Sequence, residues 1–387
     1  MRRLPAHLGL NLVYLVPGET GGTETFAREF IPALLAEAPE LRVTAFVNRE
    51  AAEAGGGPWG ELIPAVTVPV RARRRAEWVA GEQLLLPRLA ARAGVDLLHS
   101  LANTSPARGR FRRVVTVHDL IHRIHPEAHF GAAAKAMGLL VRLAVARADR
   151  VIAPSTSTRD DLVRLLGTPA DKVDVVLQGH GDAPATAGDA AGTRARLELG
   201  ERPIVLSLSA MRPHKNLPRL LEALAAIAAE RRPLLVLPGY ATGHGEELGR
   251  RAEELGLEGD VRFPGWVSAE DLEGLYAAAS VFVFPSLYEG FGAPVVEAMA
   301  RGVPVACSPR GSLAEVAGDA ARFFDPERPT EIAAAIEALL ADPAERERLR
   351  VAGLARAARF NWAANARGTL AAYERALAAP GDALPVP

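Results

Sequence analysis

The sequence predicts an α/β protein of two Rossmann-like domains, each built on a parallel sheet that helices cover. The chain has 387 residues, which exceeds the length at which one hydrophobic core usually stops growing, so two domains are expected. Short runs rich in β-branched residues alternate with longer helical patterns, which is typical of βαβ units. Several runs are continuously apolar, as strands buried on both faces of a parallel sheet must be.

Eight of these runs are predicted as strands, four in each half of the chain. They are 12–16, 43–47, 114–117 and 173–177, then 204–208, 234–237, 281–284 and 303–306. The first lies in an apolar stretch from Leu8 to Val16 that could imitate a signal peptide. Because the stretch contains Asn11 and has no small-residue cleavage pattern, a buried strand is favoured. Helices are predicted between the strands, among them 217–230 and 272–279.

A break in the pattern separates the two strand series. The segment from Gly181 to Gly192, "GDAPATAGDAAG", has small, turn-prone residues and no apolar periodicity, so it is predicted as a linker. Residues 1–182 are assigned to the first domain and residues 193–360 to the second. Residues 361–387 contain a C-terminal helix, with Trp362 among its apolar positions, which we expect to pack back on the first domain.

The composition excludes several classes of partner. The 45 basic and 46 acidic side chains nearly cancel, so no global field points to a nucleic-acid partner. A single cysteine, Cys307, excludes an internal disulfide framework and a thiolate metal cluster. No window approaches the roughly 20 uninterrupted apolar residues of a membrane-spanning helix. We therefore expect a soluble or peripheral protein, located in the cytoplasm.

The most informative segment runs from Val281 to Ala306. A strand is followed by a loop that carries Glu289, Gly290 and Gly292, and then by a helix that carries Glu297. Open α/β sheets bind ligands beyond the carboxyl ends of their strands. Two carboxylates placed there can accept paired hydrogen bonds from vicinal hydroxyls, and glycines let backbone amides approach a ligand. An isolated glutamate pair would more often be a turn residue and a solvated helix residue, but the setting favours a site.

Three further segments carry polar groups at strand ends. In "SLSAMRPHKNL", Arg212 and Lys215 are close enough to converge on one anion, although a solvated loop is the simpler alternative. Fixed cations of this kind would stabilise a diphosphate leaving group as it gains charge. Gly21 and Gly22 open a predicted helix whose free amides form an anion site, a weak signal that is by itself mostly a turn. Their spacing excludes the dinucleotide and P-loop fingerprints.

The third segment contains His118 and Asp119, directly after a predicted strand. His118 could donate a hydrogen bond to a sugar hydroxyl while Asp119 orients the ring, although a histidine at a strand end is structural about as often. The nearby His122, His125 and His129 stand at irregular intervals without an H-E-x-x-H pattern, so no metal site is predicted. The sequence also lacks an Asp-x-Asp pair, and we therefore expect no metal cofactor.

Two basic runs lie in the first half of the chain. The simpler interpretation of these runs is a solvent-exposed surface of the protein. The alternative is that they attract an anionic acceptor or the inner face of a membrane. The runs consist of Arg71, Arg73, Arg74 and Arg75, and of Arg108, Arg110, Arg112 and Arg113.

The segment "EGFGAPVVE", from Glu289 to Glu297, resembles the E-x7-E signature of the family-four retaining glycosyltransferases, of the mannosyltransferase-like group 1 type. The resemblance extends over nearly the whole chain. It implies the GT-B fold, in which two Rossmann-like domains face each other across a cleft. It also implies that Glu289 contacts the donor sugar, that Glu297 binds the ribose hydroxyls, and that Gly290, Phe291, Gly292 and Ala293 line the donor.

The same resemblance implies roles for the other strand-end residues. Arg212 and Lys215 match the Arg and Lys that bind the donor diphosphate, and the Gly21–Gly22 loop faces the diphosphate and the acceptor. His118 corresponds to a contact with the donor sugar. The donor would lie mainly on the second domain and the acceptor on the first.

The expected function is transfer of a hexosyl unit, with mannose favoured, from a nucleotide diphosphate sugar to a glycan, lipid-linked or small-molecule acceptor. No carboxylate is clearly placed as a covalent nucleophile, so a same-face mechanism is the simpler hypothesis. One alternative is a nucleotide-sugar epimerase or hydrolase on the same fold, which acceptor-free turnover of the donor would reveal. Another is a non-catalytic nucleotide-sugar binding protein, against which the Arg212 and Lys215 pair counts.

Overall fold

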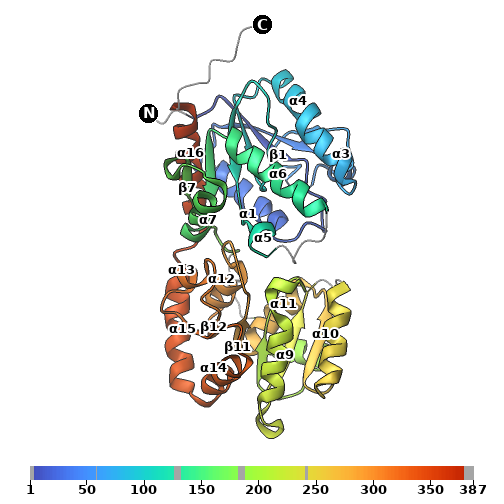
Figure 1. The fold of residues 1–387 in the computed structure, drawn as a ribbon, viewed down its shortest axis with the longest axis vertical. Helices are drawn as coiled ribbons and strands as arrows, with labels where there is room; N and C mark the ends of the chain where they lie inside the picture. Colours follow the sequence, from blue (N-terminus) through green and yellow to red (C-terminus); the bar gives the residue numbers. More distant parts are fainter. Residues whose placement is uncertain (1–3, 58, 126–131, 182–187, 240–242, 379–387) are drawn as a thin grey trace. The chain divides into compact units, whose positions relative to one another are not determined.

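The structure is a computed structural model that describes residues 4–57, 59–125, 132–181, 188–239 and 243–378. The chain forms two compact units. Unit 1 contains Met1–Arg123, Phe130–Gly179 and Asn361–Pro387, and unit 2 contains Ile124–His129 and His180–Phe360. In each unit, helices lie on either side of a central sheet (Figure 1), and separate hydrophobic clusters fill the two faces.

Unit 1 contains a seven-stranded sheet in the order β3-β2-β1-β4-β5-β6-β7, and all of its strand pairs are parallel. The strand order therefore reverses between β1 and β4. The strands are β1 (His7–Leu12), β2 (Arg42–Val47), β3 (Ala65–Thr67), β4 (Leu97–Ser100), β5 (Arg112–Thr116), β6 (Arg150–Ala153) and β7 (Val173–Val175). The helices are α1 (Gly22–Glu37), α2 (Arg49–Glu53), α3 (Arg75–Ala80), the π-helix η1 (Gly81–Leu85), α4 (Leu86–Arg92), α5 (Ile121–Ile124), α6 (Ala132–Arg147), α7 (Thr156–Leu166), the 3₁₀ turn η3 (Ala170–Lys172) and α16 (Trp362–Ala378).

Unit 2 contains a six-stranded parallel sheet in the order β10-β9-β8-β11-β12-β13. Its order reverses between β8 and β11. The strands are β8 (Ile204–Leu206), β9 (Leu234–Pro238), β10 (Val261–Gly265), β11 (Ala279–Phe284), β12 (Val305–Cys307) and β13 (Ala321–Phe323). The helices are α8 (Ala190–Arg196), the 3₁₀ turn η4 (Pro213–Lys215), α9 (Leu217–Ala226), the 3₁₀ turn η5 (Ala229–Arg231), α10 (Gly243–Glu254), α11 (Ala269–Ala278), α12 (Ala293–Ala300), α13 (Leu313–Ala317), α14 (Pro329–Ala341) and α15 (Pro343–Ala357).

The predicted α/β class and the parallel sheets are confirmed, and seven of the eight predicted strands lie where expected to within a few residues. The first predicted strand is wrong in position, because β1 ends at Leu12. The register of β1 with β2 and β4 covers His7–Leu12, and the chain then turns, with the Leu15 amide bonded to the Leu12 carbonyl at 3.1 Å. The apolar residues that follow are buried in a loop, so their hydrophobicity did not distinguish them from a strand.

The predicted linker also needs a correction at its end. Ala190 begins α8, and the Asp189 side chain caps that helix by accepting a hydrogen bond from the Gly192 amide at 2.9 Å. An Asp at the cap position is a common helix start, and here it outweighs the small residues around it. Residues 182–187 lie outside the described residues.

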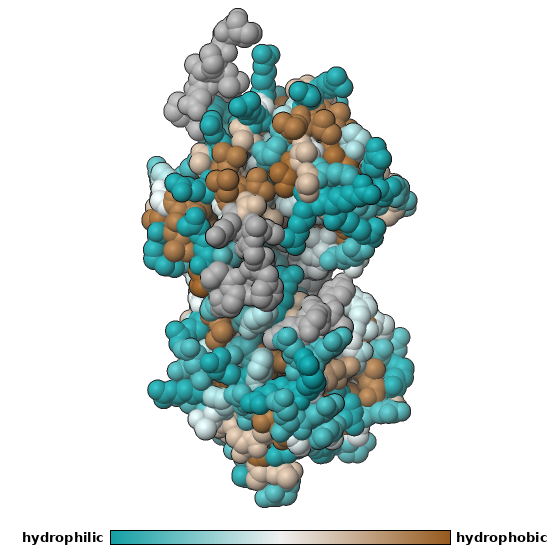
Figure 2. Space-filling model, turned by 45° about the vertical axis from the view of Figure 1, so that its right-hand side comes forward, coloured by the Kyte–Doolittle hydropathy of each residue, from teal (hydrophilic) through white to brown (hydrophobic). Residues whose placement is uncertain are grey.

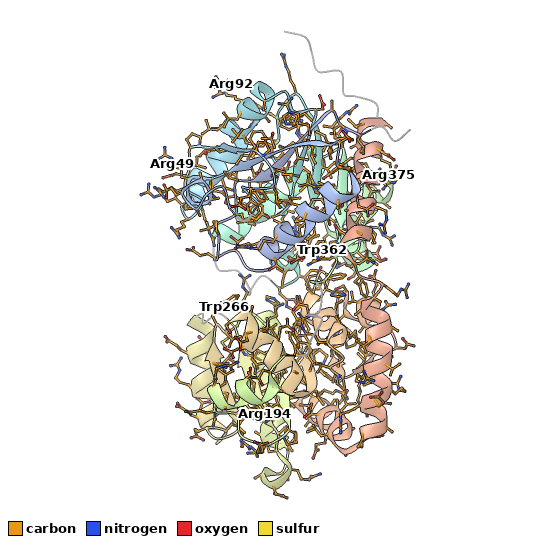
Figure 3. All side chains as sticks on the ribbon, turned by 180° about the vertical axis from the view of Figure 1, so that it is seen from behind. Arg49, Arg92, Arg194, Trp266, Trp362 and Arg375 are labelled. Atoms are coloured by element: carbon orange, nitrogen blue, oxygen red, sulfur yellow. The ribbon has the colours of Figure 1, made fainter. Side chains whose placement is uncertain are left out.

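Helix α16 belongs to unit 1, although it follows all of unit 2 in the chain. Its apolar face joins the cluster that contains α1, and Trp362 in its first turn packs edge-on against Phe26 of α1, with ring centroids 5.3 Å apart (Figure 3). The Tyr373 hydroxyl lies 2.7 Å from Nδ1 of the buried His99 in β4. The two ends of the long unit 2 segment also meet, because the His180 amide donates to the Phe360 carbonyl at 3.3 Å.

Candidate functional site

The predicted residues of unit 2 gather at the point where its strand order reverses. Strands β8 and β11 are neighbours with parallel directions, so the loops that follow them leave the same edge of the sheet. Arg212 and Lys215 belong to the loop after β8, and Glu289 belongs to the loop after β11. Open parallel sheets bind ligands beyond the carboxyl ends of their strands at such a reversal.

Backbone contacts fix these two loops against each other. The Leu287 amide donates to the His214 carbonyl at 2.8 Å. Asn216, which follows η4, has a left-handed backbone with φ of 59°, a conformation that Asn tolerates better than most residues. Its buried side-chain amide donates to the carbonyls of Pro285 (3.1 Å) and Pro326 (2.7 Å). The loop that carries Lys215 is therefore held against the loop that carries Glu289.

An ion pair connects these loops at their centre. Nζ of Lys215 lies 2.6 Å from Oε1 of Glu289, and the two side chains are only 15% and 12% exposed. The ammonium group also lies 5.3 Å from the centroid of the Phe284 ring. Because the ammonium has further N–H donors and the carboxylate has a second oxygen, the pair can bind an anion and a hydroxyl side by side.

Arg212 differs from Lys215 in its surroundings. It precedes η4 and is exposed, and no ion pair or hydrogen bond holds its side chain within the described part of the chain. An exposed guanidinium one turn from a fixed ammonium can close on a phosphate with two parallel hydrogen bonds. The structure therefore places a pre-positioned cation and an available one in the same loop.

The glycine-containing loop 289–292 is also anchored by its backbone. The Glu289 carbonyl accepts from both the amide and the hydroxyl of Ser312, each at 3.1 Å. Phe291 is buried and packs edge-on against Phe360 at 5.6 Å. Gly292 caps α12 with φ of 93°, and a Cβ there would lie 2.4 Å from the Leu313 side chain, so glycine is favoured at this position. Ala293 begins α12.

Glu297 belongs to α12, and its side chain is partly buried rather than free in solvent. Its Oε2 accepts a hydrogen bond from the Tyr276 hydroxyl at 3.2 Å. Burial raises the pKa of Glu297, and the nearby guanidinium of Arg301 opposes that rise. Among the described residues, no hydrogen bond or ion pair joins Glu297 to Glu289, Lys215 or Arg212, so it forms a second polar position at the same edge of the sheet.

Three serines at this edge were not predicted from the sequence. Ser207 and Ser209 follow β8 and Ser286 follows β11. Their side-chain oxygens are buried, and none has a hydrogen-bond partner among the described residues. A buried hydroxyl without a partner costs about 1–3 kcal/mol, which a ligand that supplies the partner would recover. In the sequence, these serines stand one to three residues after the end of a strand.

The glycine pair of unit 1 opens a helix as predicted. Gly21 caps α1 with φ of 66°, and Gly22 is its first residue. However, Glu24 already brings a carboxylate to this turn, where its Oε2 accepts from the Gly18 amide at 2.8 Å. Arg28 pairs with the other oxygen of Glu24 at 2.6 Å. A bound anion would therefore share this helix start with a carboxylate that Arg28 neutralises.

The structure orients the His118 ring through a backbone carbonyl. Its Nε2 lies 2.7 Å from the Leu101 carbonyl, which can only accept, so Nε2 carries the proton. Burial lowers the pKa of His118 and favours the neutral ring, whose Nδ1 is then an acceptor. The Leu101 carbonyl orients the ring, whereas Asp119 accepts from the Ile121 amide at 3.0 Å. In this state the Nδ1 of His118 can accept a hydrogen bond from a sugar hydroxyl.

The remaining sequence features yield no further site. Among the described residues, no three His, Cys, Asp or Glu side chains gather in a way that could hold a metal ion, and His129 lies outside those residues. Within the same ranges, no helix has the length and apolar character that a membrane span requires. Three arginines of the first basic run form ion pairs, Arg71 with Glu53, Arg73 with Glu19 and Arg74 with Glu77.

The chain is similar to two families of sugar-transferring enzymes. The model of the family described as "Glycosyl transferases group 1" matches residues 192–356, and that of "Glycosyltransferase Family 4" matches residues 20–180. Among curated proteins, it is 36% identical over 267 residues to the O-antigen chain mannosyltransferase B of Escherichia coli, which covers 68% of this chain and 70% of the relative.

Two further relatives carry related names. The MMP alpha-(1->4)-mannosyltransferase of Mycolicibacterium hassiacum is 39% identical over 181 residues, which cover 45% of this chain and 43% of that protein. The serotype-specific mannosyltransferase WbdA of Escherichia coli is 30% identical over 276 residues, or 69% of this chain. The matched region spans about a third (34%) of WbdA.

Solved structures share the fold at lower identity. A sucrose-phosphate synthase from Thermosynechococcus elongatus superposes with a TM-score of 0.78 at 23% identity, covering 97% of this chain and 100% of that one. WaaG, a glycosyltransferase involved in lipopolysaccharide biosynthesis, gives 0.74 at 16% identity, covering 94% and 98%. Anabaena HepE in complex with UDP and glucose gives 0.73 at 21% identity, covering 94% and 97%.

Proposed function

Because the chain belongs to the family-four, group 1 glycosyltransferases with the GT-B fold, and is therefore a hexosyltransferase that uses a nucleotide sugar, we propose that it transfers a mannosyl unit. The acceptor in this proposal is a sugar of a growing glycan. Three relatives that match the chain carry mannosyltransferase names, which supports mannose as the transferred unit. The epimerase, hydrolase and binding-protein alternatives receive no support from these relatives.

The observation that carries the proposal is the Lys215–Glu289 ion pair at the β8–β11 reversal, with the exposed Arg212 in the same loop. In the proposed complex, Lys215 and Arg212 bind the donor diphosphate, and Glu289 binds hydroxyls of the sugar next to it. Glu297 binds the ribose from its position in α12. The backbone amides of 290–293 and the buried serines complete the polar surroundings of the donor.

The proposed reaction breaks the bond between the anomeric carbon and the phosphate oxygen and forms a bond to the acceptor oxygen on the same face. The acceptor proton passes to the leaving phosphate oxygen, so no protein base is needed. Because negative charge grows on the diphosphate as the bond breaks, fixed cations stabilise the transition state more than the ground state. Lys215 is already held in place by Glu289, so little reorganisation is required.

The test compares variants of the two cations with a variant of a matched arginine elsewhere in unit 2. Lys215→Ala and Arg212→Ala should each lower turnover at saturating donor by about a hundredfold or more, the usual loss when one transition-state stabiliser is removed. Arg202→Ala is the control, because Arg202 precedes β8 at the opposite edge and pairs with Asp260 at 2.6 Å. Near-normal turnover in both cation variants, or an equal loss in the control, would refute the donor site.

Peripheral contact with an anionic membrane surface is a separate part of the proposal, as is a cytoplasmic location. Exposed apolar residues form small groups among polar ones on the face drawn in Figure 2. Leu84 in η1 is 60% exposed, and Arg88 is exposed on the adjoining α4. Arg92 is exposed on the same helix (Figure 3). The chain should sediment with anionic phospholipid vesicles at low salt, and an Arg88→Glu, Arg92→Glu variant should not. Equal sedimentation of both proteins would contradict the contact.

A further inference from the structure

A fully buried carboxyl group lies in unit 1 and has not yet been assigned a role. Glu82 is 0% exposed and belongs to the π-helix η1. It accepts hydrogen bonds from the Asn11 side-chain amide (2.9 Å), the Thr104 hydroxyl (2.9 Å) and the Gln83 amide (3.1 Å). No cation pairs with it among the described residues, and burial raises the pKa of its carboxyl group. A buried carboxyl without a cation is rarely justified by stability alone.

The partners of Glu82 lie where the strand order of the unit 1 sheet reverses. Asn11 in β1 stands opposite Ser100 in β4, and its side-chain amide also donates to the Ser100 hydroxyl at 3.0 Å. The side-chain oxygen of Asn11 accepts from the Val13 amide at 3.2 Å, at the start of the loop after β1. Thr104 belongs to the loop after β4. Glu82 therefore connects both loops at the place where a parallel sheet binds ligands.

The backbone is irregular at the same place. A π-helix such as η1 is rare compared with an α-helix and occurs frequently at functional sites. Asn103, next to Thr104, has φ of 33°, which is uncommon for a residue other than glycine. Its side-chain oxygen accepts from the His118 amide at 2.8 Å, so the loop after β4 also positions His118. Two local irregularities and a buried carboxyl group thus meet at one edge of the sheet.

The charges around these loops indicate what kind of ligand they suit. The side chains of the network are amides, hydroxyls and one carboxyl. Of the arginines that contact the loop after β1 and the start of α1, Arg73 pairs with Glu19 and Arg28 pairs with Glu24. A phosphate group would have to break these pairs, whereas an uncharged sugar hydroxyl would not.

We propose that Glu82 is the positioning residue that holds the carboxyl-terminal edge at β1 and β4 in shape for the acceptor, which is an uncharged, hydroxyl-rich sugar. The inference rests on the proposed function and on the expectation, drawn from the family resemblance, that the acceptor lies on the first domain. Glu82 does not touch the acceptor. It acts through Asn11 and Thr104, which fix the two loops.

The experiment uses the full chain with nucleotide diphosphate mannose as donor and two matched acceptor probes, α-linked mannobiose and its 6-phosphate. The wild-type chain should transfer to mannobiose and not to the phosphate. Glu82→Ala should raise the KM for mannobiose about tenfold, because Asn11 and Thr104 lose their common acceptor, and should change the donor KM and acceptor-free donor hydrolysis far less. Glu82→Gln should restore the acceptor KM, because its amide oxygen still accepts from both partners.

The control is His7→Ala. His7 lies at the opposite end of β1, where its buried ring contacts the Thr44 hydroxyl at 2.8 Å and the Ala93 carbonyl at 3.0 Å. It should lower stability without changing the acceptor KM. If Glu82→Ala does not fold, Thr104→Val removes one of the same hydrogen bonds and should also raise the acceptor KM.

The outcomes separate this inference from the proposed function. If the wild-type chain turns over no nucleotide diphosphate mannose, the proposed function is wrong. If it prefers the phosphorylated probe, the acceptor class is wrong. If it transfers to mannobiose while the Glu82→Ala and Thr104→Val variants keep the wild-type acceptor KM, or while His7→Ala raises it equally, Glu82 has no positioning role.

Discussion

At the residue scale, the two signature carboxylates have different partners. Glu289 is paired with the Lys215 ammonium, whereas Glu297 accepts a hydrogen bond from the Tyr276 hydroxyl of the neighbouring helix α11. The first carboxylate therefore balances a cation that we assign to the diphosphate, and the second does not. Neutralising them should affect different steps.

We expect Glu289→Gln to lower turnover while nucleoside diphosphate still binds at least as tightly as in the wild type, because Lys215 loses its counter-ion and keeps its charge. Glu297→Gln should weaken nucleoside diphosphate binding about tenfold or more, the change typical for loss of a charged hydrogen-bond acceptor. Calorimetric titration of both variants checks this. Weaker binding in the Glu289 variant alone would mean that the two roles are reversed.

The identities of these residues could be predicted from the sequence, but their contacts could not. Glu289 and Lys215 stand 74 positions apart, and only the adjacency of β8 and β11 brings them within 2.6 Å. The acceptor state of His118 depends on the Leu101 carbonyl, which no motif records. Glu82 went unnoticed because a lone glutamate in a helical pattern normally faces solvent.

At the scale of elements, the turn into α12 depends on one glycine. Gly292→Ala should destabilise the protein by at least about 1 kcal/mol, because a side chain disfavours the left-handed backbone and would also collide with Leu313. Gly249→Ala in α10 is the matched control, since a Cβ there meets nothing within 4 Å, and it should be neutral or slightly stabilising. Thermal unfolding of both variants measures the difference, and equal midpoints would contradict the assigned role of Gly292.

The attachment of α16 to the unit 1 sheet offers a second test at this scale. Tyr373→Phe should cost about 1–3 kcal/mol, because Nδ1 of the buried His99 loses its partner. Tyr14→Phe should cost less, since the Tyr14 hydroxyl only contacts the Thr23 carbonyl at 3.5 Å. Urea unfolding of the two variants gives the comparison. A larger loss for Tyr14→Phe would show that the His99 contact does not anchor the helix.

Elements with long apolar runs were the predictable ones. β9 and β11 are continuously apolar at their centres and were located to within two residues, whereas the short β3 and β13 carry exposed positions and were not predicted. The π-helix η1, between α3 and α4, has no sequence signature that distinguishes it from the helices around it. Sequence reasoning therefore missed this irregular element as well as the strands β3, β4, β6, β10 and β13.

At the scale of the whole molecule, we predict that transfer needs no added metal. The expectation rests on the missing Asp-x-Asp pair and on the two cations placed for the diphosphate. Turnover should persist in excess EDTA and should not rise when Mg²⁺ or Mn²⁺ is restored. Loss of turnover in chelator with recovery on adding either ion would overturn the expectation.

The late position of α16 determines when each unit can fold during synthesis. Unit 2 is complete once Phe360 has been made, and its segment ends beside its own beginning at His180. Unit 1 still lacks Leu370, Ala372, Tyr373 and Ala376, which belong to its core. Although domains generally fold in the order of synthesis, this chain should finish its second unit on the ribosome while the first waits with an apolar groove uncovered. That interval exposes the first unit to chaperones and proteases, and a chain truncated before α16 should be degraded even though its second unit is intact.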